Sequence, residues 1–138
     1  MGVTKMSKLL KVAVLNVESQ DFEIIDNFNH ELENMQKVVG GYIEALTIHE
    51  SDNGRELVVW LNEEGKLIGL EPNFVLAIKE TGKVADIVMG NVLITAVNEN
   101  GDTAGLTDAD IQTIKRIFEF GRSVVTPAGL VTKVLWFE

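Results

Sequence analysis

The chain of 138 residues contains no cysteine and only two histidines, His30 and His49. Without a thiol it cannot form a disulfide bond, a thiolate nucleophile or a zinc–thiolate site. Neither histidine stands at the Glu-x-x-His or His-x-x-x-His spacing that places two metal ligands on one face of a helix. The sequence therefore predicts no metal site and no cofactor, and the absence of cysteine fits a cytoplasmic protein.

Long apolar runs are also missing. No run approaches the roughly 18 residues that cross a bilayer, so we expect no membrane partner. Lys11 and Asn16 interrupt the apolar stretch from Leu9 to Val17, and no small-residue cleavage site follows it. We interpret this stretch as a strand and not as a signal peptide. The residues ahead of it, 1–7, are expected to be a disordered leader.

Basic residues are scarce and scattered. Twelve lysines and arginines oppose 21 acids, which gives a net charge of −9, and Lys115 and Arg116 form the only adjacent basic pair. Binding to a nucleic-acid backbone needs clustered cations, so we expect no nucleic acid partner. The acidity is typical of a soluble surface. A second interpretation is an acidic face that mimics DNA or docks on a basic partner protein.

The motifs of several enzyme classes are absent as well. No serine lies in a Gly-x-Ser-x-Gly context, and neither a Walker lysine motif nor Gly-x-Gly-x-x-Gly occurs. With two histidines and no cysteine, a catalytic triad is not expected. These absences favour a protein without catalytic residues. A carboxylate- and metal-dependent hydrolase stays an alternative, because 21 acids always permit a carboxylate pair although no spacing singles one out.

Hydrophobic patterns predict the elements of the first half. Apolar residues at spacings of three and four predict a helix over residues 24–39 that ends at Gly40; they are Ile25, Phe28, Leu32, Met35 and Val39. Residues 42–49 and 56–61 are β-rich, and the Asn53–Gly54 turn between them is a strong hairpin signal. The sequence therefore predicts a strand, a helix and a hairpin in this order.

The second half is less regular. Residues 66–70 are expected to form a short strand or an extended connection, and Pro72 can begin two short helical turns over residues 72–78. Residues 86–97 are predicted as one long strand with a bulge at Gly90.

The end of the chain has clearer signals. Thr107 and Asp110 have the capping-box spacing, which predicts a helix that stops near Gly121. Residues 130–137 are predicted to form a late strand. A terminal strand this apolar must be buried or paired, which makes a homo-oligomer or an assembly subunit a further possibility for the chain.

Strands with helices inserted at two or three points predict an α+β fold: a single domain with a mixed, mainly antiparallel sheet and two to three helices. We expect residues 8–121 to form its main part and residues 122–138 to add a C-terminal strand to the same domain.

Two segments of the sequence resemble a known family. Residues 40–44 read Gly-Gly-Tyr-Ile-Glu, and residues 62–73 contain Asn-Glu-Glu-Gly-Lys-Leu followed by Gly-Leu and Pro-Asn. With residues 87–92 and 106–108 in the same order, they resemble the signature of a small domain family of unknown function. That family occurs mostly in phages, prophages, mobile elements and Gram-positive bacteria. The resemblance implies a small accessory protein that acts on host machinery or host defence, and it carries over no catalytic residue.

Loop residues of this signature are the candidate ligand-binding site, because polar groups on loops beside a rigid sheet often form sites. The candidates are Tyr42, Glu44, Asn62, Glu63, Lys66 and Asn73. Lys66 would suit a phosphate or carboxylate, and Asn73 an amide or base edge. The alternative is purely structural: the glycines form turns and the leucines pack.

The function expected from these observations is binding, either of a host protein or of a small nucleotide-like ligand, with counter-defence as one setting. A nucleotide would need a local excess of base, such as Lys66 with a neighbouring cation, because the chain as a whole is acidic.

Overall fold

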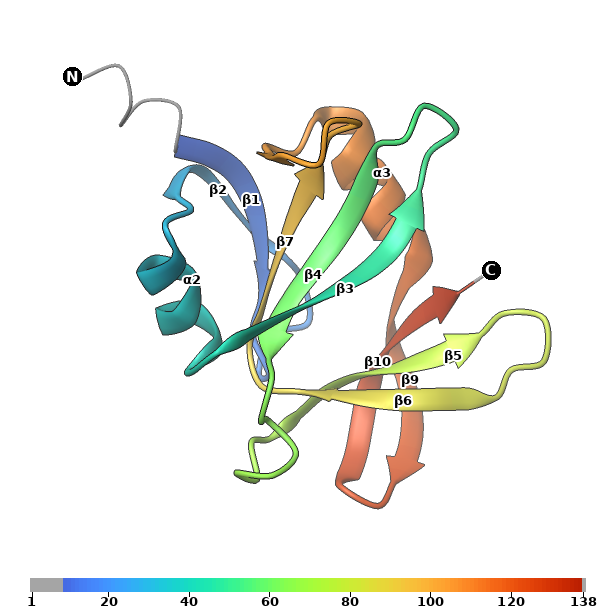
Figure 1. The fold of residues 1–138 in the computed structure, drawn as a ribbon. Helices are drawn as coiled ribbons and strands as arrows, with labels where there is room; N and C mark the ends of the chain where they lie inside the picture. Colours follow the sequence, from blue (N-terminus) through green and yellow to red (C-terminus); the bar gives the residue numbers. More distant parts are fainter. Residues whose placement is uncertain (1–8, 138) are drawn as a thin grey trace.

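The structure, a computed structural model, describes residues 9–137, and most of them lie in the strands of two sheets (Figure 1). The leader expected at residues 1–7 lies outside the described residues. Sheet A has the strand order β2-β1-β7-β4-β3, with β8 beside β7, and all its pairings are antiparallel. Its strands are β1 (Leu9–Leu15), β2 (Glu23–Asn29), β3 (Ile43–Glu50), β4 (Glu56–Asn62), β7 (Val92–Val97) and β8 (Thr103–Ala104).

Sheet B has the strand order β6-β5-β10-β9. Its strands are β5 (Pro72–Ile78), β6 (Val84–Met89), β9 (Phe118–Thr126) and β10 (Gly129–Phe137). The last strand, β10, is parallel to β5 and antiparallel to β9, so both of its edges are occupied. The described residues contain two helices, α2 (Leu32–Val39) and α3 (Asp108–Ile117). None of the described helices is long and apolar enough to cross a membrane.

Three apolar clusters hold these layers together. The main core lies between the sheets and against α3, and its fully buried side chains include Leu15, Val59, Phe74, Ile114 and Leu135. A second cluster joins α2 to the other face of sheet A; its buried members are Val12, Val14, Met35 and Leu93. The third lies on the other face of sheet B, where side chains of its own strands pack together; its buried members are Val75, Ala77, Val131 and Val134. Central strands such as β5 therefore carry buried apolar side chains on both faces.

Aromatic rings close one side of the sandwich. Phe22, in the β1–β2 connection, packs edge-to-face against Phe118 and Phe120 of β9, with ring centroids 5.1 and 5.4 Å apart. Phe118 in turn meets Phe74 of β5 at 5.1 Å. Edge-to-face contacts of this kind stabilise aromatic pairs beyond their buried area. The β1–β2 end of sheet A is thus fixed to sheet B.

A buried lysine strengthens the same side. Lys133 of β10 is 1% exposed, and its ammonium donates hydrogen bonds to the carbonyl oxygens of Asn16, Val17 and Ser19 at 2.9, 2.9 and 2.8 Å. Burial lowers the pKa of Lys133 to about 8. The three acceptors match the three N–H donors of an ammonium group, which a neutral amine cannot all supply.

The opposite side of the sandwich is open. β3 is the last strand of sheet A and β6 the last strand of sheet B, and each pairs with one neighbour only among the described residues. Charged side chains stand on both strands, Glu44 and Glu50 on β3 and Asp86 on β6. Charges on an edge strand discourage uncontrolled pairing with other chains.

The expected α+β class is wrong, because the chain is mainly β and folds into two sheets. The largest error is the helix predicted over residues 24–39: its first part is β2, and only Leu32–Val39 is helical. Ile25 and Phe28 stand opposite Val12 and Leu10 of β1. Between these pairs two residues of β2 face one residue of β1, so a bulge gives the spacing that resembles a helix.

Two further predictions in the second half are wrong. Residues 72–78 form β5 and no helical turn, because Pro72 is the first residue of a strand that alternates between the two apolar clusters. Residues 86–97 form no single strand. Gly90, with φ +84°, turns the chain from β6 in sheet B to β7 in sheet A. Residues 63–69 form consecutive turns and no strand.

Several local predictions are confirmed. β1, β3, β4 and β10 lie where the patterns place strands. Gly40 has φ +80° at the end of α2, and Gly54 has φ +87° in the β3–β4 hairpin. Thr107 and Asp110 form the complete capping box at the start of α3. This helix ends at Ile117, before the expected Gly121, because Phe118 already belongs to β9.

Asp110 also connects α3 to the β3–β4 hairpin, which gives a testable dependence on pH. It accepts hydrogen bonds from Arg55 Nη2 at 2.6 Å and from the Thr107 N–H at 2.8 Å. Burial raises the pKa of Asp110, but the Arg55 and Thr107 bonds outweigh it, and the pKa is lowered. The folded state therefore binds this proton less readily than the unfolded state, so the stabilisation is present above the unfolded-state pKa and is lost as pH falls through the folded-state pKa.

We predict that Asp110→Asn lowers the free energy of unfolding at pH 7 by about 1–3 kcal/mol, the cost of losing charge-assisted hydrogen bonds. The difference from the unmodified protein should shrink as the pH falls below about 4, where the carboxyl of the unfolded chain becomes protonated. Urea unfolding at pH 7 and pH 3 measures both values. Asp108→Asn, in the same helical turn, is the control, and a loss that is equal at both pH values contradicts the prediction.

Candidate functional site

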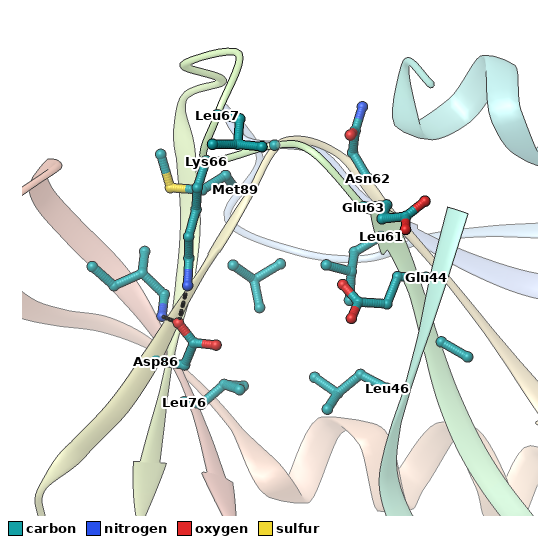
Figure 2. A pocket seen from close by; sticks show the side chains of 14 residues that line it. Glu44, Leu46, Leu61, Asn62, Glu63, Lys66, Leu67, Leu76, Asp86 and Met89 are labelled. Carbon is teal, nitrogen blue, oxygen red and sulfur yellow. Dashed lines mark hydrogen bonds and ion pairs between the residues drawn. The ribbon is translucent and has the colours of Figure 1, made fainter. Parts of the chain in front are cut away.

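A cleft of about 310 Å³ lies on the open side of the sandwich, between β3 and β4 of sheet A and β5 and β6 of sheet B (Figure 2). Leucines form its floor, with Leu46 from β3, Leu61 from β4 and Leu76 from β5. The turns over residues 63–69 form its upper margin, where Leu67 projects with 85% of its surface exposed. An apolar floor with a few polar groups around it is the usual composition of a binding site.

The charged groups of the cleft stand on both walls. Glu44 of β3 lies on one wall, and Lys66 and Asp86 meet on the other, where the Lys66 ammonium bonds to the Asp86 carboxylate (Figure 2). Partial burial raises the pKa of Asp86, but the bonds from Lys66 and from the Ile87 N–H outweigh it, and the pKa is lowered. Glu63 adds a third carboxylate. Three acids and one base give the cleft a negative balance.

Three predicted site residues, Glu44, Glu63 and Lys66, therefore line one cleft with exposed side chains. Tyr42 does not line it. Its side chain is 67% exposed and borders a neighbouring hollow together with Ile68 and Asn62. The structure brings these residues to the same end of the molecule, although only part of the predicted set can touch one small ligand.

Asn62 has an internal role. It is 3% exposed, its Nδ2 donates to the Val39 carbonyl at 3.1 Å, and its Oδ1 accepts from the Glu64 N–H at 2.8 Å. Its amide points away from the cleft (Figure 2). A Cβ on Gly41 would lie 2.8 Å from Asn62 Nδ2, so this contact requires glycine. Asn62 joins the end of α2 to the first turn after β4, and it is placed to support the cleft margin.

Asn73 is internal too. It is 1% exposed, and its Nδ2 donates to the carbonyl oxygens of Leu15 and Gly90 at 2.9 Å each. These bonds tie β5 of sheet B to the end of β1 and to the turn between β6 and β7. Asn73 therefore lies outside the cleft lining and cannot present its amide to a ligand there.

Sequence reasoning missed Asp86 and the apolar floor. Asp86 pairs with Lys66 across 20 positions of the sequence, and only the pairing of β6 with β5 brings it there. The spacing of residues in the sequence does not predict a contact between residues this far apart. The continuous apolar run of residues 74–78 was the available signal for Leu76, because a short apolar run of this length is typical of a strand buried on both faces.

A comparison with known protein families matches residues 10–119 to DUF3846, a domain of unknown function. The chain belongs to the DUF3846 family. The matched segment contains every residue that lines the cleft, and it ends at the start of β9. No curated protein and no solved structure matches the chain. The expected membership in a domain family of unknown function is therefore confirmed, and the family assigns no activity to the cleft.

Within residues 9–137, no three side chains of the His, Asp and Glu type converge as a metal site would need. Three acids line the cleft, and one of them, Asp86, forms an ion pair with Lys66.

The internal position of Asn73 gives a direct test against its predicted role in ligand binding. We predict that Asn73→Ala lowers the free energy of unfolding by about 1–3 kcal/mol, because two buried carbonyls lose their partner. The loss of stability should lie near the lower end of this range, because the substitution also removes Asn73 Oδ1, a buried acceptor without a partner in the described structure. Thermal or urea unfolding measures the change.

The control for this measurement is Asn100→Ala, which changes the same side chain in an exposed loop and should alter stability by less than about 0.5 kcal/mol. Equal stability of the Asn73→Ala protein and the unmodified protein would contradict the internal role of Asn73.

Proposed function

We propose that this DUF3846 protein acts by binding, and that the cleft holds an extended, positively charged segment of a partner protein. The charge of the cleft supports this choice. Glu44 and Glu63 have no cationic partner among the described residues, and the one lysine of the cleft is occupied by Asp86. A cationic side chain would find an unpaired carboxylate there, whereas a phosphate would meet a negative surface. Of the two ligand classes that the sequence suggests, a protein partner fits this cleft better than a nucleotide.

The position of the cleft supports an extended segment. It lies between β3 and β6, the edge strands of the two sheets on the open side, whose outer edges are unpaired within the described residues. An extended peptide can add to such an edge by main-chain hydrogen bonds, while its alternate side chains enter neighbouring pockets. A segment beside β3 would pass Glu44, Ala45 and Leu46, which line the cleft. Its basic side chains would then meet Glu44 and its apolar ones the leucine floor.

Exposed apolar side chains around the cleft support a macromolecular partner. Leu67 is 85% exposed, Tyr42 67% and Ile68 57%. Leu67 stands on the margin of the cleft, and Tyr42 and Ile68 border the hollow next to it. Aromatic and apolar anchors near the centre of an interface often contribute most of its binding energy. We assign these three side chains to the contact with the partner.

The setting of this function is proposed from the resemblance of residues 40–44 and 62–73 to a family of phages, prophages and mobile elements. In that setting the partner is a protein of the host bacterium, met in its cytoplasm, and counter-defence is the role proposed for the complex. A homo-oligomer stays a prediction. β10 cannot supply a free edge for it, because β5 and β9 already occupy both sides of this strand.

The proposal predicts charge-selective peptide binding. A dye-labelled peptide that alternates arginine and valine should bind the protein in a fluorescence anisotropy titration, and its glutamate–valine counterpart should not. Glu44→Gln should weaken binding of the arginine peptide by about twofold to fivefold, the upper part of the range expected for one exposed charge contact. Raising the salt concentration should weaken it further, because screening reduces exposed charge interactions.

Glu50→Gln is the matched control, since Glu50 is exposed on the same strand and lies outside the cleft lining. It should change the dissociation constant by less than about twofold, because its charge acts only at a distance. Equal effects of the two substitutions, or equal binding of the two peptides, would show that the cleft is not the site.

A further inference from the structure

A second hollow, of about 340 Å³, has the opposite charge from the cleft. It opens where the last turn of α3 meets the strands β9 and β10 of sheet B. Its lining residues are Lys79, Arg116, Ile117, Glu119, Arg122 and Trp136. Three of the 12 basic residues of an acidic chain therefore gather around one opening with a single carboxylate. A local excess of positive charge on a protein of net charge −9 calls for a separate explanation.

The single carboxylate of this hollow orders the groups beside it. Glu119 Oε1 accepts hydrogen bonds from Arg122 Nε and from Trp136 Nε1, both at 3.0 Å. The bonds from Arg122 and Trp136 lower the pKa of Glu119. The guanidinium of Arg122 also lies over the Trp136 indole, 5.7 Å from the ring centroid. Glu119 thus fixes an arginine against a tryptophan, and it uses only one N–H of the arginine to do so.

Both arginines keep donors for a ligand. The ion pair with Glu119 occupies Arg122 Nε, and the terminal nitrogens of Arg122 make no hydrogen bond to a described residue. Arg116, which is exposed in the last turn of α3, makes no side-chain hydrogen bond or ion pair with the described residues. Guanidinium groups present planar pairs of N–H donors that match the oxygen atoms of a phosphate.

We propose that this hollow binds a small phosphomonoester, with its phosphate on Arg116 and Arg122 and its organic part against Trp136 and Ile117. Its volume lies at the lower end of the roughly 300–1,000 Å³ typical of small-molecule sites. A third hollow, of about 380 Å³, shares Ile117 and Trp136 with it and extends to residues 47–50 of β3. Space for an organic group therefore exists beside the anion site.

This site is distinct from the acidic cleft in charge and in position. Arg122 and Trp136 also lie beyond residue 119, where the match to the DUF3846 family ends. The proposed site therefore includes two residues outside the family match, Arg122 and Trp136, and two inside it, Arg116 and Ile117. If no peptide binds at the cleft, the phosphate proposal still stands. If no phosphate binds at this hollow, the peptide proposal still stands.

The test uses the full chain and the two indole N–H signals in its proton–nitrogen NMR spectrum, since Trp60 and Trp136 are the only tryptophans. Trp136→Phe assigns the signals. Inorganic phosphate, adenosine monophosphate and adenosine are added in separate titrations at low salt. We expect saturable shifts of the Trp136 signal with phosphate and, at lower concentration, with adenosine monophosphate. Adenosine should produce no saturable shift over the same range, and the Trp60 signal should stay in place.

Arg116→Gln should raise the dissociation constant for adenosine monophosphate about tenfold, the effect of losing one charged hydrogen-bond donor. Lys115→Gln removes the same charge from the neighbouring exposed residue, which does not line the hollow. It should change the constant by less than about twofold, since it acts only through the screened field.

No saturable shift with any phosphate, or equal losses for the two variants, would overturn the phosphate site. Adenosine binding as well as its monophosphate would overturn it too. Equal affinities for inorganic phosphate and adenosine monophosphate would overturn the assignment of an organic part to Trp136.

Discussion

The two sheets depend on one polar seam, which runs along the chain from Leu15 to Ser19 at the end of β1. Two buried side chains of sheet B hold this seam: Asn73 donates to the carbonyl of Leu15, and Lys133 donates to the carbonyls of Asn16, Val17 and Ser19. Buried carbonyls without partners are costly, so the seam fixes where sheet A can rest on sheet B. The phenylalanine cluster around Phe118 then excludes water from the same side.

A sandwich that is closed on one side and open on the other has a cleft where its free edges meet. β3 and β6 are those edges here, and the acids along them leave a negative opening above an apolar floor. β3 links the two ends of the molecule: its first half lines the acidic cleft, and its second half borders the hollow beside Trp136. The uneven charge therefore follows from the strand order, which separates acidic and basic residues that the sequence intermixes.

Local patterns were sufficient where neighbouring residues decide the structure. The Asn53–Gly54 turn and the Thr107 cap are fixed by contacts within a few residues, and both were predictable. The β2 error had a different origin, because only pairing with β1 converts the spacing of Ile25 and Phe28 into a bulge. For the site, the charged candidates Glu44, Glu63 and Lys66 lie at an opening, and their role in binding stays a prediction. The sequence could not place Asn73, because an amide is polar enough for a site and small enough to satisfy buried backbone carbonyls, as it does here.

The central claim is that the free edges of β3 and β6 are the surface that receives a partner. Amide hydrogen exchange, compared between the free protein and its complex with the arginine–valine peptide, tests this claim most directly. Bound peptide should slow exchange along residues 43–47 of β3 or residues 84–88 of β6 and leave β9, the edge strand of sheet B on the closed side, unchanged. Slower exchange at β9 alone, or no change at β3 and β6 in a saturated complex, would contradict it.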